Sequence, residues 1–154
     1  MLWRSVLALI CAAACAQAEP TLTLDGVTAL PRLSDSFGGL SAIEMSDGGA
    51  EALVLSDRGA LFHLLLDRTG DTVEVVSATP DDRTAQLGDT EGMAVDTQGR
   101  LFISLEGPAG IFAEGADGTF ERLKDHADFA GMVTNRALEA LAVSADGTLV
   151  TMPE

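Results

Sequence analysis

Residues 89–106 read DTEGMAVDTQGRLFISLE, and this stretch decides the fold. It predicts a strand, a tight turn at 97–99 and a second strand that ends on the carboxylate of Glu106. The same pattern occurs upstream at 41–57 and downstream at 139–154, and the copies start 50 and 48 residues apart. Short strands that repeat with a period of about 40–50 residues are typical of β-propeller blades.

We therefore predict an all-β fold, a β-propeller of four-stranded blades, with two complete blades and part of a third. The expected strands lie at 41–46, 52–57, 60–66 and 71–77 in the first blade, at 91–95, 100–106, 110–113 and 119–124 in the second, and from 139 onward in the third. Because a propeller ring needs about four or more blades, we expect the chain to be the front part of a longer propeller.

Three further segments surround these strands. Residues 21–30 alternate loosely between apolar and polar side chains and predict a hairpin or an edge strand. Residues 78–89 are polar, contain Pro80 and are expected to cross between the first two blades. The second crossing, 125–138, has room for a helical turn near its start.

The first 18 residues are expected to be a secretory signal peptide. Arg4 provides a basic start, residues 6–16 are apolar, and residues 16–18 form a small-x-small cleavage site. The apolar run is too short for a transmembrane helix. We therefore predict export to the periplasm or the exterior without membrane insertion, and a propeller domain over residues 19–154.

The chain has two cysteines, Cys11 and Cys15. A lipoprotein signal would place the lipid on Cys15, although Ala12 occupies a position where a large aliphatic residue is preferred. Both cysteines, Cys11 and Cys15, lie inside the leader, so the exported domain needs no disulfides.

The domain is strongly acidic. Residues 19–154 carry eight basic and 24 acidic side chains, a formal net charge of −16. Such a surface repels nucleic acid and anionic lipid and attracts cations, so we exclude both nucleic acid and anionic lipid as partners. Solubility in a salty exterior is the simplest explanation of the acidity.

The repeat places polar or acidic side chains at two equivalent positions in each copy. They are Ser41, Glu91 and Glu139 at the start of the first strand, and Asp57, Glu106 and Glu154 at the end of the second. In a propeller the innermost strands line the channel, so these positions form a ring. Ca²⁺ takes about six to eight hard oxygen ligands, and a ring of carboxylates can supply them. The expected metal ligands are Asp57, Glu91, Glu106 and Glu139.

The same acids also have a purely structural interpretation. A glutamate at a strand start can repeat because it hydrogen-bonds the backbone of the neighbouring blade. An acid at a strand end has no such requirement, so metal or substrate binding is favoured more strongly for Asp57 and Glu106.

Two arginines are candidates for binding an anionic substrate. Arg58 follows Asp57 directly, and Arg136 lies three residues before Glu139, so both are expected near the channel mouth. Arg83, in the first crossing, is expected to be solvated.

The sequence offers no clear nucleophile or general base. Residues 39–43 read GLSAI and lack the glycine that would close a nucleophile elbow. His63 lies in an apolar strand and is expected to be a core histidine, and His126 has no second His or Cys at metal-ligand spacing. The catalytic residues therefore stay unknown at this level.

At these motifs the sequence resembles the secreted phytase-like domain family, also described as esterase-like activity of phytase. The resemblance rests on FGGLS at 37–41, LSDRG at 55–59, DTEGMA at 89–94, SLE at 104–106 and LEALA at 138–142. It implies a β-propeller, export and hydrolysis of phosphate or other esters, with Ca²⁺ as the candidate cofactor. Ala140 departs from the family pattern, in which glycine is common at that position.

Three functions follow from this sequence. The first is an exported, Ca²⁺-assisted hydrolase of phosphate or carboxylic esters that acts on a small molecule. The second is a non-catalytic propeller that binds a ligand or partner outside the cell, favoured by the lack of a clear nucleophile or phosphate cradle. The third is an inactive fragment, since a site built from a whole ring would be incomplete here.

Overall fold

The computed structural model describes residues 21–24, 26–30, 33–69, 72–133 and 136–154; the expected signal peptide, residues 1–18, lies outside the described residues. The described chain is all-β, with ten strands and two short 3-10 helices, which confirms the predicted fold class. None of the described helices has the length and apolar character that a membrane crossing requires.

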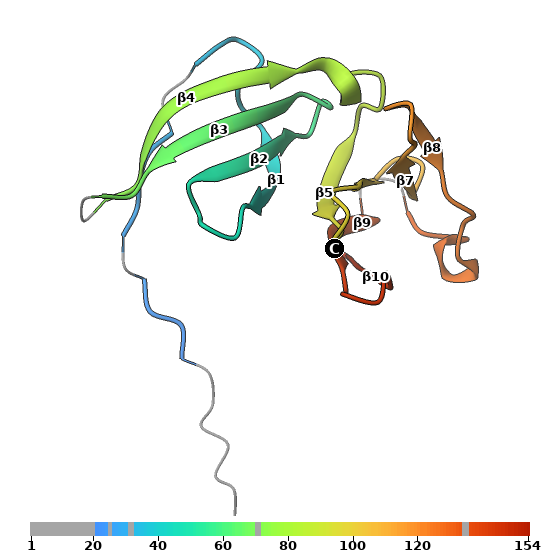
Figure 1. The fold of residues 1–154 in the computed structure, drawn as a ribbon. Coiled ribbons are helices and arrows are strands. Elements are labelled where there is room, and N and C mark those ends of the chain that lie inside the picture. Colours follow the sequence, from blue (N-terminus) through green and yellow to red (C-terminus); the bar gives the residue numbers. More distant parts are fainter. Residues whose placement is uncertain (1–20, 25, 31–32, 70–71, 134–135) are drawn as a thin grey trace, which may run out of the picture.

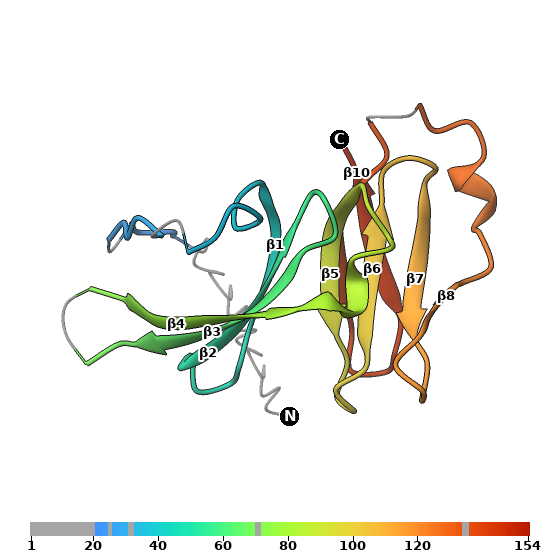
Figure 2. The same ribbon diagram turned by 90° about the horizontal axis from the view of Figure 1, so that it is seen from above.

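Figures 1 and 2 between them label all ten strands. They are β1 (Leu40–Met45), β2 (Glu51–Ser56), β3 (Leu61–Asp67), β4 (Glu74–Asp81), β5 (Thr90–Val95), β6 (Leu101–Leu105), β7 (Gly110–Glu114), β8 (Phe120–Arg122), β9 (Leu138–Val143) and β10 (Leu149–Pro153).

The strands form three antiparallel sheets in chain order. Sheet 1 has the order β1-β2-β3-β4, sheet 2 the order β5-β6-β7-β8, and sheet 3 the pair β9-β10. The first strands of the sheets lie next to one another, β1 beside β5 and β5 beside β9 (Figure 1). The two predicted four-stranded units and the start of a third are thus confirmed, and the described residues form no closed sheet.

A glycine with positive φ closes the first hairpin of each sheet. Gly49, Gly99 and Gly147 occupy the equivalent position of the three turns, and their φ angles are 66°, 81° and 84°. Each glycine N–H donates to the carbonyl oxygen three residues earlier, at 2.8–3.0 Å. A side chain with a Cβ rarely adopts this backbone conformation, so the Asp/Gly clusters of the sequence correctly marked the turns.

Apolar layers lie between consecutive sheets. Leu55 and Leu61 of sheet 1 pack with Met93, Leu101 and Ile103 of sheet 2, and all five are buried. Burial of each such side chain stabilises the fold by about 1.5–3 kcal/mol.

The opposite face of sheet 2 packs against sheet 3. Ala94 and Phe102 lie in one buried cluster with Leu138 and Leu141. Strand β6 is buried along its whole length because it has a sheet on each side.

The structure corrects two expectations about the connections. Strand β4 continues through Pro80 to Asp81, where the sequence predicted a loop. Because β4 is an edge strand, the missing N–H of Pro80 leaves no gap in a ladder. Residues 21–24 and 26–30 form no strand, and Leu22 is 99% exposed, so the alternating pattern there has no pairing partner. The expected helical turn in the second crossing is confirmed as η2 (Ala127–Phe129).

Two polar residues of sheet 1 also differ from expectation. Arg83 is partly exposed but not free in solvent: it pairs with Asp81 and with Glu114, and so links sheets 1 and 2 through η1 (Asp82–Thr84). His63 is not a core residue, since its side chain is half exposed and its Nε2 lies 3.0 Å from Asp81 Oδ2.

Candidate metal centre

One hydrogen bond repeats in all three sheets and fixes the acid at the end of each second strand. The backbone N–H of that acid is the donor. The acceptor is the carbonyl oxygen of the residue that lies two positions before the polar residue of the first strand (Ser41, Glu91 or Glu139). The three bonds are Asp57 to Gly39 (2.7 Å), Glu106 to Asp89 (3.1 Å) and Glu154 to Ala137 (3.2 Å).

A β-bulge marks the first-strand position in every sheet. The pairing register shifts at Ser41 between β1 and β2, at Glu91–Gly92 between β5 and β6, and at Glu139 between β9 and β10. A bulge leaves a residue unpaired and turns its side chain away from the regular alternation. The bulges therefore direct these side chains to the same end of the sheets as the second-strand acids.

Hydroxyl groups connect the sheets at this end. Ser41 Oγ donates to Thr90 O (2.8 Å), which ties sheet 1 to sheet 2. Ser104 Oγ accepts from the bulge amide of Gly92 (2.9 Å) and donates to Leu138 O (3.1 Å), which ties sheet 2 to sheet 3. Ser104 is completely buried, so these ties hold the bulge in a fixed position.

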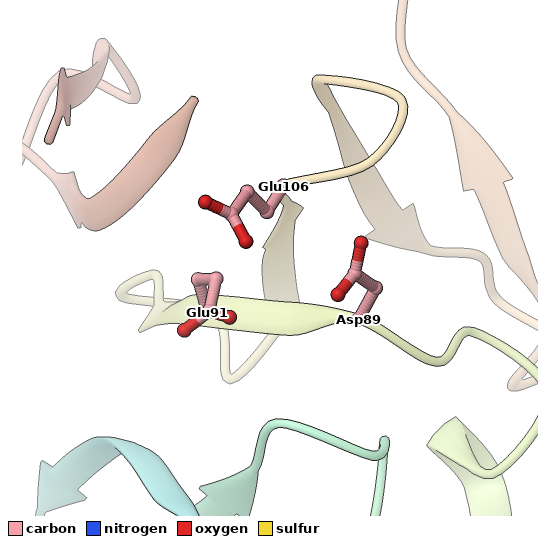
Figure 3. A group of neighbouring side chains, drawn as sticks. All are labelled: Asp89, Glu91 and Glu106. Atoms are coloured by element: carbon pink, nitrogen blue, oxygen red, sulfur yellow. The ribbon is translucent and has the colours of Figure 1, made fainter. Parts of the chain in front are cut away.

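The bulges and strand ends gather five carboxylates into two overlapping groups. Each residue of a group offers one carboxylate oxygen, and these oxygens lie within 4.8 Å of one another. The first group is Asp89, Glu91 and Glu106, drawn in Figure 3, and the second is Glu106, Glu139 and Glu154. Glu106 belongs to both groups and is the centre of the site.

The five carboxylates have no basic partner in the part of the chain that the structure describes. Among the described residues, no ion pair includes any of the five. Partial burial, together with the charges of Glu139, Glu106, Asp89 and Asp57, raises the pKa of Glu91 to about 7. Burial and its acidic neighbours also raise the pKa of Glu106, against a smaller opposing effect from the backbone N–H of Ala137. The fold thus holds negative charges together at a cost that a bound cation would relieve.

Three of the four expected ligands meet in this centre. Glu91, Glu106 and Glu139 are brought together, whereas Asp57 belongs to neither group. Asp57 lies on sheet 1 with its Oδ1 buried, 3.5 Å from Arg58 Nε and without a hydrogen-bond partner in the described part of the chain.

The expected substrate-binding arginines lie outside the centre. Arg58 is exposed and lines a cavity of about 370 Å³ together with Phe37 and Leu40. Arg136 is exposed, and its backbone N–H donates to Val133 O. Neither arginine pairs with any of the five clustered carboxylates in the described structure.

The sequence did not identify Asp89 as a ligand and did not include Glu154 in the ligand set. Asp89 lies just before β5 with a φ of 49°, an uncommon backbone conformation for a residue other than glycine. Asp89 lies two residues before Glu91, and this spacing places both side chains on the same face of an extended chain. Glu154 occupies the same repeat position as Glu106.

The donor set fits a hard divalent cation. All five side chains offer carboxylate oxygen, which suits Ca²⁺ or Mg²⁺, and neither group contains the His or Cys that transition metals prefer. The two groups share Glu106, so one carboxylate can contact cations on both sides.

Comparison with known proteins identifies the family. A family model described as "Phytase-like: Esterase-like activity of phytase" matches residues 35–154, which covers all three sheets. A search of curated proteins finds no match to the chain. The family match covers more than half of the chain, so the chain belongs to this family.

Proposed function

We propose that this member of the phytase-like family is an exported, divalent-cation-dependent hydrolase of phosphate or other esters. One observation carries the proposal: five carboxylates converge on Glu106 without a basic partner among the described residues. An arrangement of this kind favours a cation, and a cation in turn attracts the oxygens of an ester. The family match, which names an esterase-like activity, supports the reaction class.

We assign Ca²⁺ as the preferred cation. Ca²⁺ takes about six to eight oxygen ligands in flexible geometry, whereas Mg²⁺ demands an octahedral arrangement and retains its waters. Four long glutamate side chains at the ends of four different strands provide that flexibility, and Asp89 adds a shorter ligand. When bound, the cation would polarise the ester oxygen and lower the pKa of a bound water.

The side chains then divide into three roles. Glu106 bridges the two acidic groups, Asp89 and Glu91 hold one side, and Glu139 and Glu154 hold the other. Arg58, after β2 of sheet 1, and Arg136, before β9 of sheet 3, lie outside the centre and would orient an anionic group of the substrate that extends from it. The substrate is a small molecule, because a chain of this acidity repels nucleic acid.

We also propose that the three sheets are blades of a β-propeller. The identical hydrogen bond, bulge and glycine turn in each sheet, together with the face-to-face apolar layers, support this architecture. The acidic centre then lies at the channel end where the first strands begin.

The proposal is tested by assaying residues 19–154 for phosphate release from 4-nitrophenyl phosphate and for hydrolysis of 4-nitrophenyl acetate. The assays are run with chelator, with Ca²⁺ and with Mg²⁺ at equal ionic strength. Turnover that requires Ca²⁺ and is lost in Glu106→Gln supports the proposal. Ca²⁺ binding without turnover of either ester would instead identify a non-catalytic binding protein.

A further inference from the structure

A cavity of about 290 Å³ adjoins the acidic centre. Its lining comes from the loop after β6 (Glu106, Pro108, Ala109), from Arg122 at the end of β8, and from the crossing around η2 (His126, Phe129, Met132). Glu106 is thus shared by both acidic groups and by this cavity. A ligand in the cavity lies directly beside the carboxylate at which the two groups meet.

We propose that this cavity binds the alcohol part of the ester and selects a small aromatic group that carries a hydrogen-bond acceptor. The inference rests on the proposed hydrolase function and names the substrate class for that site. Hydrolysis breaks the bond between the alcohol oxygen and the acyl or phosphoryl group. The water oxygen joins that group, and a water proton goes to the leaving alcohol.

Size and polarity select an aromatic ring. A cavity of about 150 Å³ lined by apolar side chains accommodates benzene, so a cavity of about 290 Å³ has room for a substituted phenyl ring. Pro108, Ala109, Phe129 and Met132 give it apolar contacts.

Arg122, an exposed residue, gives the cavity a polar side. Its Nη2 donates to Ala109 O (2.6 Å), and its Nε donates to Asp125 Oδ1 (3.0 Å). The guanidinium lies flat over Gly110, where an added Cβ would come within 2.5 Å of Arg122 Cζ. In the described structure Nη1 has no hydrogen-bond partner, so it can donate to an acceptor on the ligand.

His126 gives the second donor. Its Nδ1 accepts from the backbone N–H of Asp128 (3.3 Å) and lies 3.5 Å from Asp128 Oδ2, so Nε2 is the ring nitrogen that would donate to a ligand. No described residue hydrogen-bonds to Nε2. The His126 ring lies 6.1 Å from the Phe129 ring, centroid to centroid, and both residues line the cavity.

The test compares two esters that differ only in the alcohol. Phosphate release from 4-nitrophenyl phosphate and from methyl phosphate is measured with residues 19–154 in saturating Ca²⁺. Met132→Trp fills the cavity, and Gly110→Ala displaces Arg122 without changing charge. Met45→Trp, a partly exposed site on sheet 1, is the matched control.

We expect Met132→Trp and Gly110→Ala each to raise KM for the aryl ester about tenfold. KM for the methyl ester and the Ca²⁺ affinity should stay within about twofold of the unaltered chain, as should every parameter of Met45→Trp. An equal change for both esters, or no change for either, in a variant that melts cooperatively would overturn the inference.

A binding measurement separates this inference from the proposed function. Titration of 4-nitrophenol into the chain in chelator, followed by calorimetry, needs neither metal nor turnover. Binding that is lost in Met132→Trp and Gly110→Ala supports the cavity even if no ester is hydrolysed. Turnover by the unaltered chain without any binding of 4-nitrophenol overturns the cavity assignment and leaves the hydrolase proposal intact.

Discussion

The backbone N–H of Glu106 donates a hydrogen bond to the carbonyl oxygen of Asp89 (3.1 Å), and carboxylate oxygens of the same two residues approach within 4.8 Å. The main chain thus holds two negative side chains together that would repel each other in solution. The same hydrogen bond in the other two sheets shows that this closeness is built into the repeat and does not depend on the acids themselves. The backbone therefore sets the closeness of the carboxylates, and a divalent cation is the partner that we propose for them.

The first prediction concerns the shared carboxylate. Glu106→Gln removes a negative charge from both acidic groups, so Ca²⁺ affinity should fall about tenfold or more. Glu91→Gln, which belongs to one group only, should have the smaller effect. Calorimetric titration of Ca²⁺ into each variant measures both affinities.

Glu121→Gln is the matched control, because it makes the same chemical change at an exposed position of β8. Its Ca²⁺ affinity should equal that of the unaltered chain. Equal losses in Glu106→Gln and Glu121→Gln would mean that Ca²⁺ responds only to the overall charge, and the centre would not be a specific site.

The second prediction concerns pH in the presence of chelator. The pKa of Glu91 is raised from 4.5 to about 7 in the folded chain, so the folded state binds this proton more tightly than the unfolded state. Its contribution to stability is present below pH 4.5 and is lost as the pH rises through about 7. Glu91→Gln should therefore melt higher than the unaltered chain above pH 7, by about 3 °C.

The difference in melting temperature between the two proteins cancels the titrating groups that do not interact with Glu91, whereas Glu106 contributes to the difference through its repulsion of Glu91. Asp67, Asp117 and Asp146 have lowered pKa values because hydroxyl or backbone groups donate hydrogen bonds to them. Their contribution to stability is therefore lost only as the pH falls below 3.8. Saturating Ca²⁺ should reduce the difference above pH 7. A melting-temperature difference that stays constant from pH 4 to pH 8 would contradict the raised pKa.

The repeat made the sheets predictable. The hairpins were found because each needs a positive-φ glycine at a fixed place, and a glycine can be recognised in the sequence. The same spacing located Glu91, Glu106 and Glu139 and predicted that they would meet. Local rules repeated three times therefore sufficed for the strands and for most of the centre.

The remaining features depend on contacts that no local pattern records. Asp89 joins the centre because the crossing from η1 enters β5 through a left-handed residue that is not glycine. Arg83 pairs with Glu114 across two sheets, 31 positions away along the chain. His126 became a candidate only when η2 placed it beside the loop after β6.

The third prediction concerns the packing of sheets 2 and 3. An added Cβ at Gly92 would lie 2.5 Å from Ser104 Oγ and 2.8 Å from the backbone nitrogen of Leu141. The second contact is with backbone, which cannot turn away, so Gly92→Ala should destabilise the fold by about 2 kcal/mol. Gly48→Ala is the control, since no atom lies within 4 Å of its added Cβ. Urea denaturation of both variants gives the difference, and equal stabilities would contradict the close packing.

The fourth prediction concerns the serine that holds the bulge. Because of the bulge at Glu91–Gly92, the N–H of Gly92 takes no part in the regular pairing of β5 with β6. It donates a hydrogen bond to Ser104 Oγ instead. Ser104→Ala leaves this buried N–H and the Leu138 carbonyl without their side-chain partner, which should cost about 2 kcal/mol. The bulge also directs Glu91 into the acidic centre. Ca²⁺ affinity should therefore fall about threefold to tenfold, although no ligand has been changed.

Ser144→Ala is the control that separates a general loss of stability from a change in the positions of the metal ligands. Ser144 makes comparable hydroxyl hydrogen bonds to Asp146 and Thr148, but it lies exposed in the β9–β10 turn. Its substitution should cost about 0.5 kcal/mol and leave Ca²⁺ affinity unchanged. Affinities are measured well below the melting temperature, so that every variant is folded. If Ser104→Ala loses stability but keeps its full Ca²⁺ affinity, the bulge does not position Glu91, and the ligand geometry must be set by the strand ends alone.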